Sequence, residues 1–323
     1  MRKYLSVILP FLIMVAIAGI CIGIYMIFTN GFPKFRKNVN STNSIPVAPV
    51  VKDSEVILSF EELPRIDAAG LTQPLTIELV RDITQNSDIS ESDFDFSTTE
   101  EGFNKLINDN VDVIISTYPS DDIITLAKTK GIELEITPIA KDGFVFFVNS
   151  NNPIDSIKVS DIQKIYNGQI KNWSQIGGSN TQIRAFQRPD NSPSQNEMKA
   201  GVMKNLNIVD PPKDVFESKK FGKISDLIAL YDNSENAIGY SYYYETNILY
   251  DSDAKISNTI KLLKINDIEP SYETIKDGTY PIQTNYYMIR NKNNSSESLE
   301  LFTNAVLSDR GKNVIKEAGY IDN

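Results

Sequence analysis

The chain has 323 residues, a net charge of -10 and ordinary proportions of hydrophobic (41%) and charged (23%) residues, which predicts a globular protein of one large or two smaller domains. The acidic balance disfavours a nucleic acid as partner, because phosphate backbones repel a negative surface. Histidine is absent and there is one cysteine, which excludes Ser-His triads, zinc clusters and an intrachain disulfide. We therefore expect no metal, no cofactor and no enzymatic activity.

An uncharged apolar segment occupies residues 4–28. About 20 apolar residues suffice to span a bilayer, so the segment predicts a membrane anchor within residues 1–30. A cleaved signal peptide and a lipid anchor at Cys21 are the alternatives. Against them, only a weak cleavage site follows the segment, and Ile20 stands where a lipoprotein signal needs a small residue. Residues 31–53 are polar with scattered prolines, which predicts a flexible linker.

From there the chain alternates between helical and strand patterns. Helices are predicted where apolar residues recur at helical spacing or where an acidic start and a glycine stop bracket the run, and strands where β-branched and aromatic residues cluster. Such alternation predicts an α/β protein with mainly parallel sheets, most simply in two lobes. The predicted helices are 71–83, 99–109, 120–131, 159–169 and, as one long helix or two abutting ones, 295–319; the predicted strands are 111–117, 132–139, 144–149 and 181–187.

Several stretches, taken together, resemble the phosphate-binding proteins of phosphate ABC importers. In that family a strand ending in V-N-x-x-N-P leads to a helix ending in I-Y-x-G-x-I-x-N-W, and this chain has VNSNNP and IYNGQIKNW in that order. An arginine turn follows, RPDNSPS at 188–194, where the family has R-x-x-x-S-G-T/S. PRIDAAGLTQPL, NAIGYSYYY, IKLLKINDIEPSYETIKDGTYPIQ and GKNVIKEAGYI also match, so the resemblance runs from Leu58 to Ile321.

The resemblance implies an α/β, two-lobed type II periplasmic-binding-protein fold, here preceded by the N-terminal transmembrane segment. By that pattern lobe one is 54–142 plus 284–323, and lobe two is 143–283. The two lobes would be joined by crossing strands near 140–147 and 280–289 and would close on a ligand.

The family holds a dehydrated phosphate with hydroxyls, backbone N–H groups and one arginine, which can bond two oxygens at once. For Thr72 and Ser192 a simple helix cap is the alternative interpretation. Asp190 matches an acid that braces the arginine in the family. The positions of this chain that match the family's ligand-binding residues are Thr72, Thr99, Arg188, Ser192 and Ser194.

Three positions depart from the family pattern. Pro193 replaces a glycine whose N–H faces the ligand, so one donor is lost. Glu100 stands where small residues are usual, and an ionised carboxylate there would oppose an anion unless it points away. Thr117 or Tyr118 falls where many members carry an acid that accepts the proton of phosphate.

The predicted function is an extracellular solute-binding protein that captures inorganic phosphate, or a similar oxyanion, for an ABC importer by hinge closure. Its predicted partners are the ABC permease and the membrane, which it reaches through its N-terminal anchor, and we expect a monomer. The alternatives are another small anion as ligand, or a degenerate binding-protein fold that acts as a sensor or interaction module.

Overall fold

The computed structural model describes residues 57–188, 192–204, 206–210, 234–246 and 259–323. The chain divides into two compact units at Ile45/Pro46, and the first unit lies outside the described residues. The predicted anchor and linker lie outside them as well. Within the described ranges, none of the helices combines the length and the apolar character needed to cross a bilayer.

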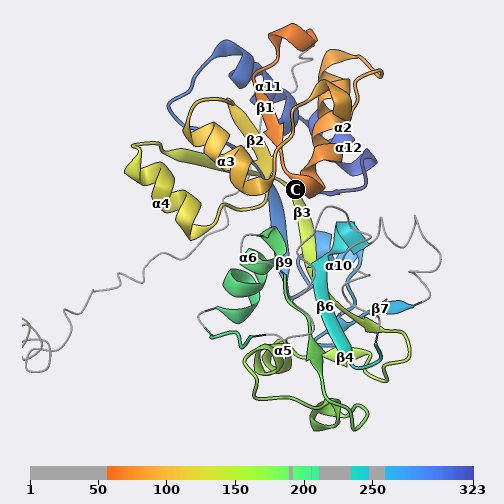
Figure 1. Ribbon diagram of the computed structural model, residues 1–323. Coiled ribbons are helices and arrows are strands. Elements are labelled where there is room, and N and C mark those ends of the chain that lie inside the picture. The colour runs from red at the N-terminus through yellow and green to blue at the C-terminus, as the bar shows by residue number, and fades with distance from the viewer. Residues whose placement is uncertain (1–56, 189–191, 205, 211–233, 247–258) are drawn as a thin grey trace, which may run out of the picture. The chain divides into compact units, whose positions relative to one another are not determined.

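One long strand, β3 (Leu134–Asn149), belongs to two sheets. Its first part pairs with β9 (Gln283–Asn291) in sheet A, and its last part pairs with β6 (Ala237–Tyr242) in sheet B. Figure 1 shows β3 running from one group of helices to the other. The sequence predicted two strands here, broken near Gly143. The strand continues because Gly143 is extended and accommodates a neighbour, Ile275, whose Cδ1 would lie 2.7 Å from an added Cβ.

The sheets are mixed, so the prediction of mainly parallel sheets is wrong for the described residues. β1 (Ile66–Ala68) runs parallel to β2 (Val113–Ser116), but β9 and β3 then follow in antiparallel pairings, giving the order β1-β2-β9-β3. In sheet B, β5 (Arg184–Ala185) is parallel to β6, whereas β6 is antiparallel to β3. The physical reason is that β3 joins the two sheets and runs antiparallel to β9 in sheet A and to β6 in sheet B.

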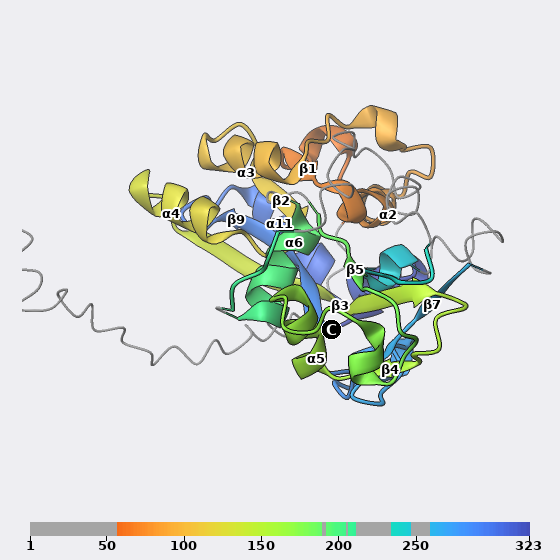
Figure 2. The same ribbon diagram turned by 60° about the horizontal axis from the view of Figure 1, so that its bottom comes forward.

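Helices cover both faces of sheet A. One face packs against α2, α11 and α12 around a core that includes Leu75, Leu79 and Phe302; the other packs against α3 and α4 around Phe103 and Ile114. Both views show α3 and α4 on the side of the sheet away from α2 (Figures 1 and 2). These helices are α2 (Gln73–Thr84), α3 (Thr99–Ile107), α4 (Asp121–Thr129), α11 (Glu297–Leu307) and α12 (Asp309–Glu317).

The C-terminal helical pattern forms two abutting helices, α11 and α12, which was one of the two predicted possibilities. Ser308 separates them: its hydroxyl donates to Ala305 O (2.7 Å) and accepts from Gly311 N (3.0 Å). The hydroxyl therefore satisfies groups at the end of one helix and the start of the next.

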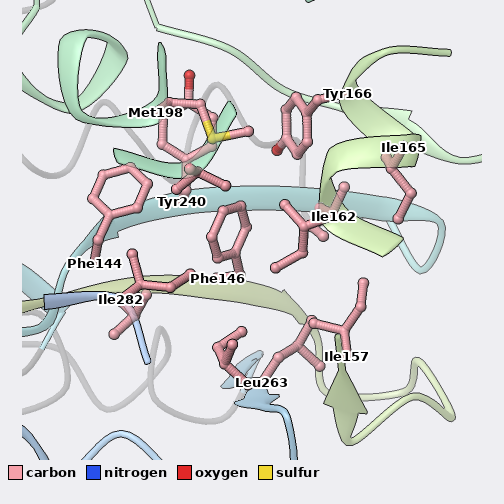
Figure 3. Packing of buried hydrophobic residues seen from close by; sticks show 14 of the residues in the cluster. Phe144, Phe146, Ile157, Ile162, Ile165, Tyr166, Met198, Tyr240, Leu263 and Ile282 are labelled. Carbon is pink, nitrogen blue, oxygen red and sulfur yellow. The ribbon is translucent and has the colours of Figure 1, made fainter. Parts of the chain in front are cut away.

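Sheet B packs around an aromatic core. Phe146 on β3 lies 5.9 Å from the ring of Tyr240 on β6 and 6.2 Å from Tyr166, and Figure 3 shows these rings together with Met198 and Ile162. Tyr240 and Tyr242 of the YSYYY stretch are both buried in this core. The remaining described elements near this core are β4 (Ser156–Ile157), α5 (Val159–Tyr166), α6 (Pro193–Glu197) with a π turn at Met198–Met203, β7 (Ile260–Leu262), β8 (Lys264–Ile265) and α10 (Tyr272–Lys276).

Residues near the C-terminus contact the turn that follows β1. The hydroxyl of Tyr320 donates to Leu71 O (2.5 Å), in the turn that follows β1. The Tyr320 ring stacks on Tyr244 at 3.7 Å and meets Tyr286 edge-on at 5.5 Å. β10 (Ile321–Asp322) then pairs with β3. Residues 320–322 thus pack between the turn after β1 and the strands β3 and β9.

A buried carboxyl, Asp142, lies at the point where β3 leaves sheet A. It accepts hydrogen bonds from Gly143 N (2.7 Å), Tyr244 N (3.1 Å) and the hydroxyl of Tyr286 (2.6 Å). Burial, opposed by these hydrogen bonds, raises the pKa of Asp142 to about 7, and the charge of Glu245 adds to the rise. The ordinary pKa is 3.8, so near neutral pH the folded protein holds a proton here that the unfolded chain has released.

Stability should therefore depend on pH through Asp142. Because the pKa is raised on folding, the folded state binds more protons between pH 4 and 7, and the free energy of unfolding should fall as pH rises through this window and level off above it. Between pH 5 and pH 7 we expect Asp142 to account for a fall of about 2 kcal/mol. Asp142→Asn, measured by urea denaturation beside the wild type, should remove this part of the slope; parallel curves would contradict the assignment.

Candidate functional site

The arginine turn lies at the edge of sheet B, where β5 ends and α6 begins. Arg188 follows β5, and Ser192 caps α6, with its hydroxyl accepting from Gln195 N (3.3 Å). Asp190, predicted to brace the arginine, lies outside the described residues. Pro193 is the first helical residue, where a missing N–H costs no intrahelical hydrogen bond. We call the described residues of this turn, Arg188 and Ser192–Ser194, the anion loop.

Gln195 ties the two ends of the anion loop together. Its Oε1 accepts from Arg188 N (3.1 Å) and from the hydroxyl of Tyr240, which itself lies 3.1 Å from Arg188 N. Its Nε2 donates to Gln187 Oε1 (3.3 Å). Gln195 and Tyr240 are buried, so this network fixes where the backbone of Arg188 stands relative to Ser192 and Ser194.

Buried acidic and phenolic side chains interact electrostatically with Arg188. Glu245 is buried, accepts from the hydroxyl of Ser241 and attracts Arg188 electrostatically; its pKa is raised, because the cost of burial exceeds these favourable contacts. The charges of Glu245 and Arg188 both act on Tyr242, and burial raises the pKa of Tyr242 well above the ordinary value. The Tyr242 hydroxyl is buried and makes no hydrogen bond to the described residues. Arg188 thus lies within electrostatic reach of Glu245 and Tyr242.

Thr72 and Thr99 form a second set, on sheet A. Thr72 is buried in the turn between β1 and α2, and its hydroxyl lies 2.5 Å from Ile115 O and 3.1 Å from Ala69 O. The hydroxyl hydrogen therefore serves the turn itself. Thr72 is also the N-cap of α2, although its side chain makes no capping hydrogen bond.

Thr99 is the first residue of α3, and the cap is the preceding residue, Thr98. The Thr98 hydroxyl accepts from Glu101 N (3.4 Å), and Glu101 Oε2 accepts from Thr98 N (3.2 Å), a capping box. Asp67 adds a third internal contact, since its Oδ1 accepts from Ser97 N (2.9 Å). Carboxylates of the protein thus already occupy part of this helix start, while Thr99 is half-buried and Glu100 exposed.

The departures from the family pattern have definite places. Thr117 is half-buried just after β2, and Tyr118 is 48% exposed with its ring edge-on to Tyr287 at 5.4 Å. The structure joins Arg188 and Ser192 through Gln195, has Ser194 beside Gln195 in α6, and places Thr72 and Thr99 on sheet A. Gln195, Tyr240 and Glu245 were not foreseen as part of the site. The signal for Gln195 was its spacing, three residues after a predicted cap.

One strand, β3, is shared by the two sheets, and the anion loop lies at the start of α6. The chain belongs to the PBP superfamily, since the family model described as the PBP superfamily domain matches residues 66–310. Within the part of the chain that the structure describes, no group of three or more Asp, Glu or Cys side chains is arranged to hold a metal ion.

Individual relatives are phosphate-binding proteins by name. The phosphate-binding protein PstS of Borreliella burgdorferi is 23% identical over 265 residues, covering 81% of this chain and 90% of the relative. PstS of Staphylococcus haemolyticus is 26% identical over 236 residues, 69% of each.

Solved structures share the fold. A putative phosphate ABC transporter substrate-binding protein with bound phosphate from Clostridium perfringens has a TM-score of 0.59 at 18% identity, covering 80% of this chain and 98% of that one. An ABC-type phosphate transport receptor from Vibrio cholerae has a TM-score of 0.59 at 19% identity, covering 80% and 99%. This likeness is of fold, and it bears out the predicted α/β binding-protein architecture.

Gln195→Leu should destabilise the protein while keeping the size of the side chain. The change leaves the buried hydroxyl of Tyr240 and the N–H of Arg188 without their shared acceptor, so we expect unfolding to become easier by about 2 kcal/mol. Tyr240→Phe is the matched control, because Gln195 then still accepts from Arg188, and its effect should be smaller. Equal losses in the two variants, measured by urea denaturation, would contradict this role for Gln195.

Proposed function

We propose that this protein is an extracellular solute-binding protein that captures inorganic phosphate for an ABC importer by hinge closure. The observation that carries the proposal is the anion loop, where Gln195 holds Arg188 and Ser192 together at a helix start and Ser194 follows in the first turn. An arginine bonds two oxyanion oxygens at once, and helix starts favour negative charge. The phosphate-binding proteins among its relatives support the choice of ligand.

In this mechanism the lobe built on sheet B binds first and the lobe built on sheet A closes over the ligand. Arg188, Ser192 and Ser194 contact the anion, with Asp190 as brace of the arginine. Thr99 donates from the start of α3. For Thr72 to donate as well, its hydroxyl hydrogen must leave Ile115 O. Closure is favoured because a bound anion gains contacts to both lobes.

The proposal includes a place in the cell. The apolar segment at residues 4–28 would anchor the protein in the cell membrane with the large domain outside, next to the permease that receives the phosphate. The protein would act as a monomer, without a metal or cofactor and without catalysis.

Calorimetric titration of the full-length protein in mild detergent with phosphate at neutral pH is the direct test. We expect binding in the micromolar range, and Arg188→Ala should abolish the heat because it removes the one arginine of the loop. Sulfate is the control ligand. No heat up to millimolar phosphate would contradict phosphate capture and favour another ligand or a sensor-like use of the same fold.

Pro193→Gly should strengthen phosphate binding. The substitution restores an N–H at the first position of α6, a donor that the helix itself does not use. A hydrogen bond to a charged ligand contributes about 1.5–3 kcal/mol, so the dissociation constant should fall about tenfold or more. Pro193→Ala is the matched control, since it restores the same N–H with less backbone freedom. Unchanged affinity in both variants would mean that this N–H does not face the ligand.

A further inference from the structure

The helix that begins at the anion loop is fastened at its other side to a crossing strand. We call Pro193–Met203, which is α6 and the π turn after it, the anion helix. Glu197 is the last residue of α6, and its Oε2 accepts a hydrogen bond from the hydroxyl of Thr284 on β9 (3.0 Å). Both views show α6 beside β9 (Figures 1 and 2). This contact links sheet B's loop helix to a strand of sheet A.

Thr284 lies at the crossing itself. It is buried and pairs directly with Asp142 of β3, so it stands where the chain passes between the two sheets. A side chain bonded to Thr284 is therefore fixed relative to the crossing strands and not only to its own lobe.

The anion helix is shaped to hold Glu197 in this position. Gly201, one turn further on, carries no Cβ, and a Cβ added there would clash with Glu197 Oε1. The same stretch, Met198–Met203, is a π turn, a distortion that often accompanies a functional requirement. The Glu197 carboxyl thus lies over Gly201, and a side chain at that position would oblige the carboxyl to move.

The surroundings of Glu197 are phenolic rather than cationic. Its charge acts on Tyr287 of β9 and on Tyr242 of β6, and burial raises its pKa while the hydrogen bond from Thr284 opposes the rise. No ion pair of Glu197 is seen among the described residues. The hydrogen bond to Thr284 is accordingly the polar contact that orients this side chain.

We propose that Glu197 is a positioning residue that holds the anion helix against the crossing strand β9 through Thr284, and so sets the affinity of the anion loop and couples it to closure of the lobes. This proposal rests on the proposed function, since it concerns the same site. Ser192 and Ser194 lie on the turns of the helix just before Glu197, so loosening its attachment would move both serines relative to the crossing.

The test is phosphate titration of full-length Glu197→Ala, Thr284→Val and the double variant. Loss of the contact should weaken binding about tenfold in each single variant, and the double variant should be no weaker than either, because both remove one contact. Glu197→Gln keeps an acceptor for Thr284 and should stay within about twofold of the wild type. Asn196→Ala, the neighbouring residue, is the matched control, and circular dichroism checks that every variant is folded.

Wild-type affinity in Glu197→Ala, or additive losses in the double variant, would overturn the proposal. If the wild type itself binds no phosphate, the proposed function fails, and amide hydrogen exchange of Ser194–Met198 without ligand then decides. Faster exchange in Glu197→Ala and Thr284→Val, but not in Glu197→Gln, supports the positioning role. Unchanged exchange in all three variants overturns it.

Discussion

The backbone pairing of β3 with β9 is the contact on which the other parts depend. It extends from Leu134 opposite Asn291 to Gly143 opposite Gln283, with one irregularity between Pro138 and Ala140. Every element proposed to touch the ligand is attached to these strands or to their neighbours. The turn before α2 follows β1, and its Thr72 hydroxyl donates to Ile115 O of β2. The anion helix contacts β9 through the hydrogen bond between Glu197 and Thr284. A movement of these strands would therefore reach both halves of the proposed site.

Acidic side chains lie close to the proposed anion site, although a bound anion would be repelled by ionised carboxylates. The chain carries a net charge of -10, and three acidic side chains with raised pKa values, Asp142, Glu197 and Glu245, lie near the crossing and the arginine. Burial raises the pKa of each of these carboxyls, so each ionises less readily than an exposed carboxyl would. This lowers the electrostatic cost of placing an anion near them.

The sequence predicted the α/β class, the helices from 71 to 169 and the arginine loop because each rests on local patterns: helical spacing, cap residues and a motif with several fixed positions. It did not predict that β3 is one strand, since a Lys-Asp-Gly sequence ordinarily marks a turn and only the packing of Ile275 shows why the glycine is there. The hydrogen-bond partners of Gln195 and Glu197 could not be predicted from the sequence either. Tyr240 and Thr284 are 45 and 87 residues away along the chain, and no local rule joins such pairs.

The position of Tyr320 has a consequence for how the molecule is made. The turn after β1 is completed by a hydroxyl that lies 249 residues later, and β9 must come between β2 and β3 before sheet A exists. Contacts between distant parts of a chain slow folding, because a long loop has to close first. The turn after β1 therefore lacks its hydrogen bond from Tyr320 until that residue has emerged. We expect the part of the proposed site on sheet A to be completed late, on whichever side of the membrane folding happens.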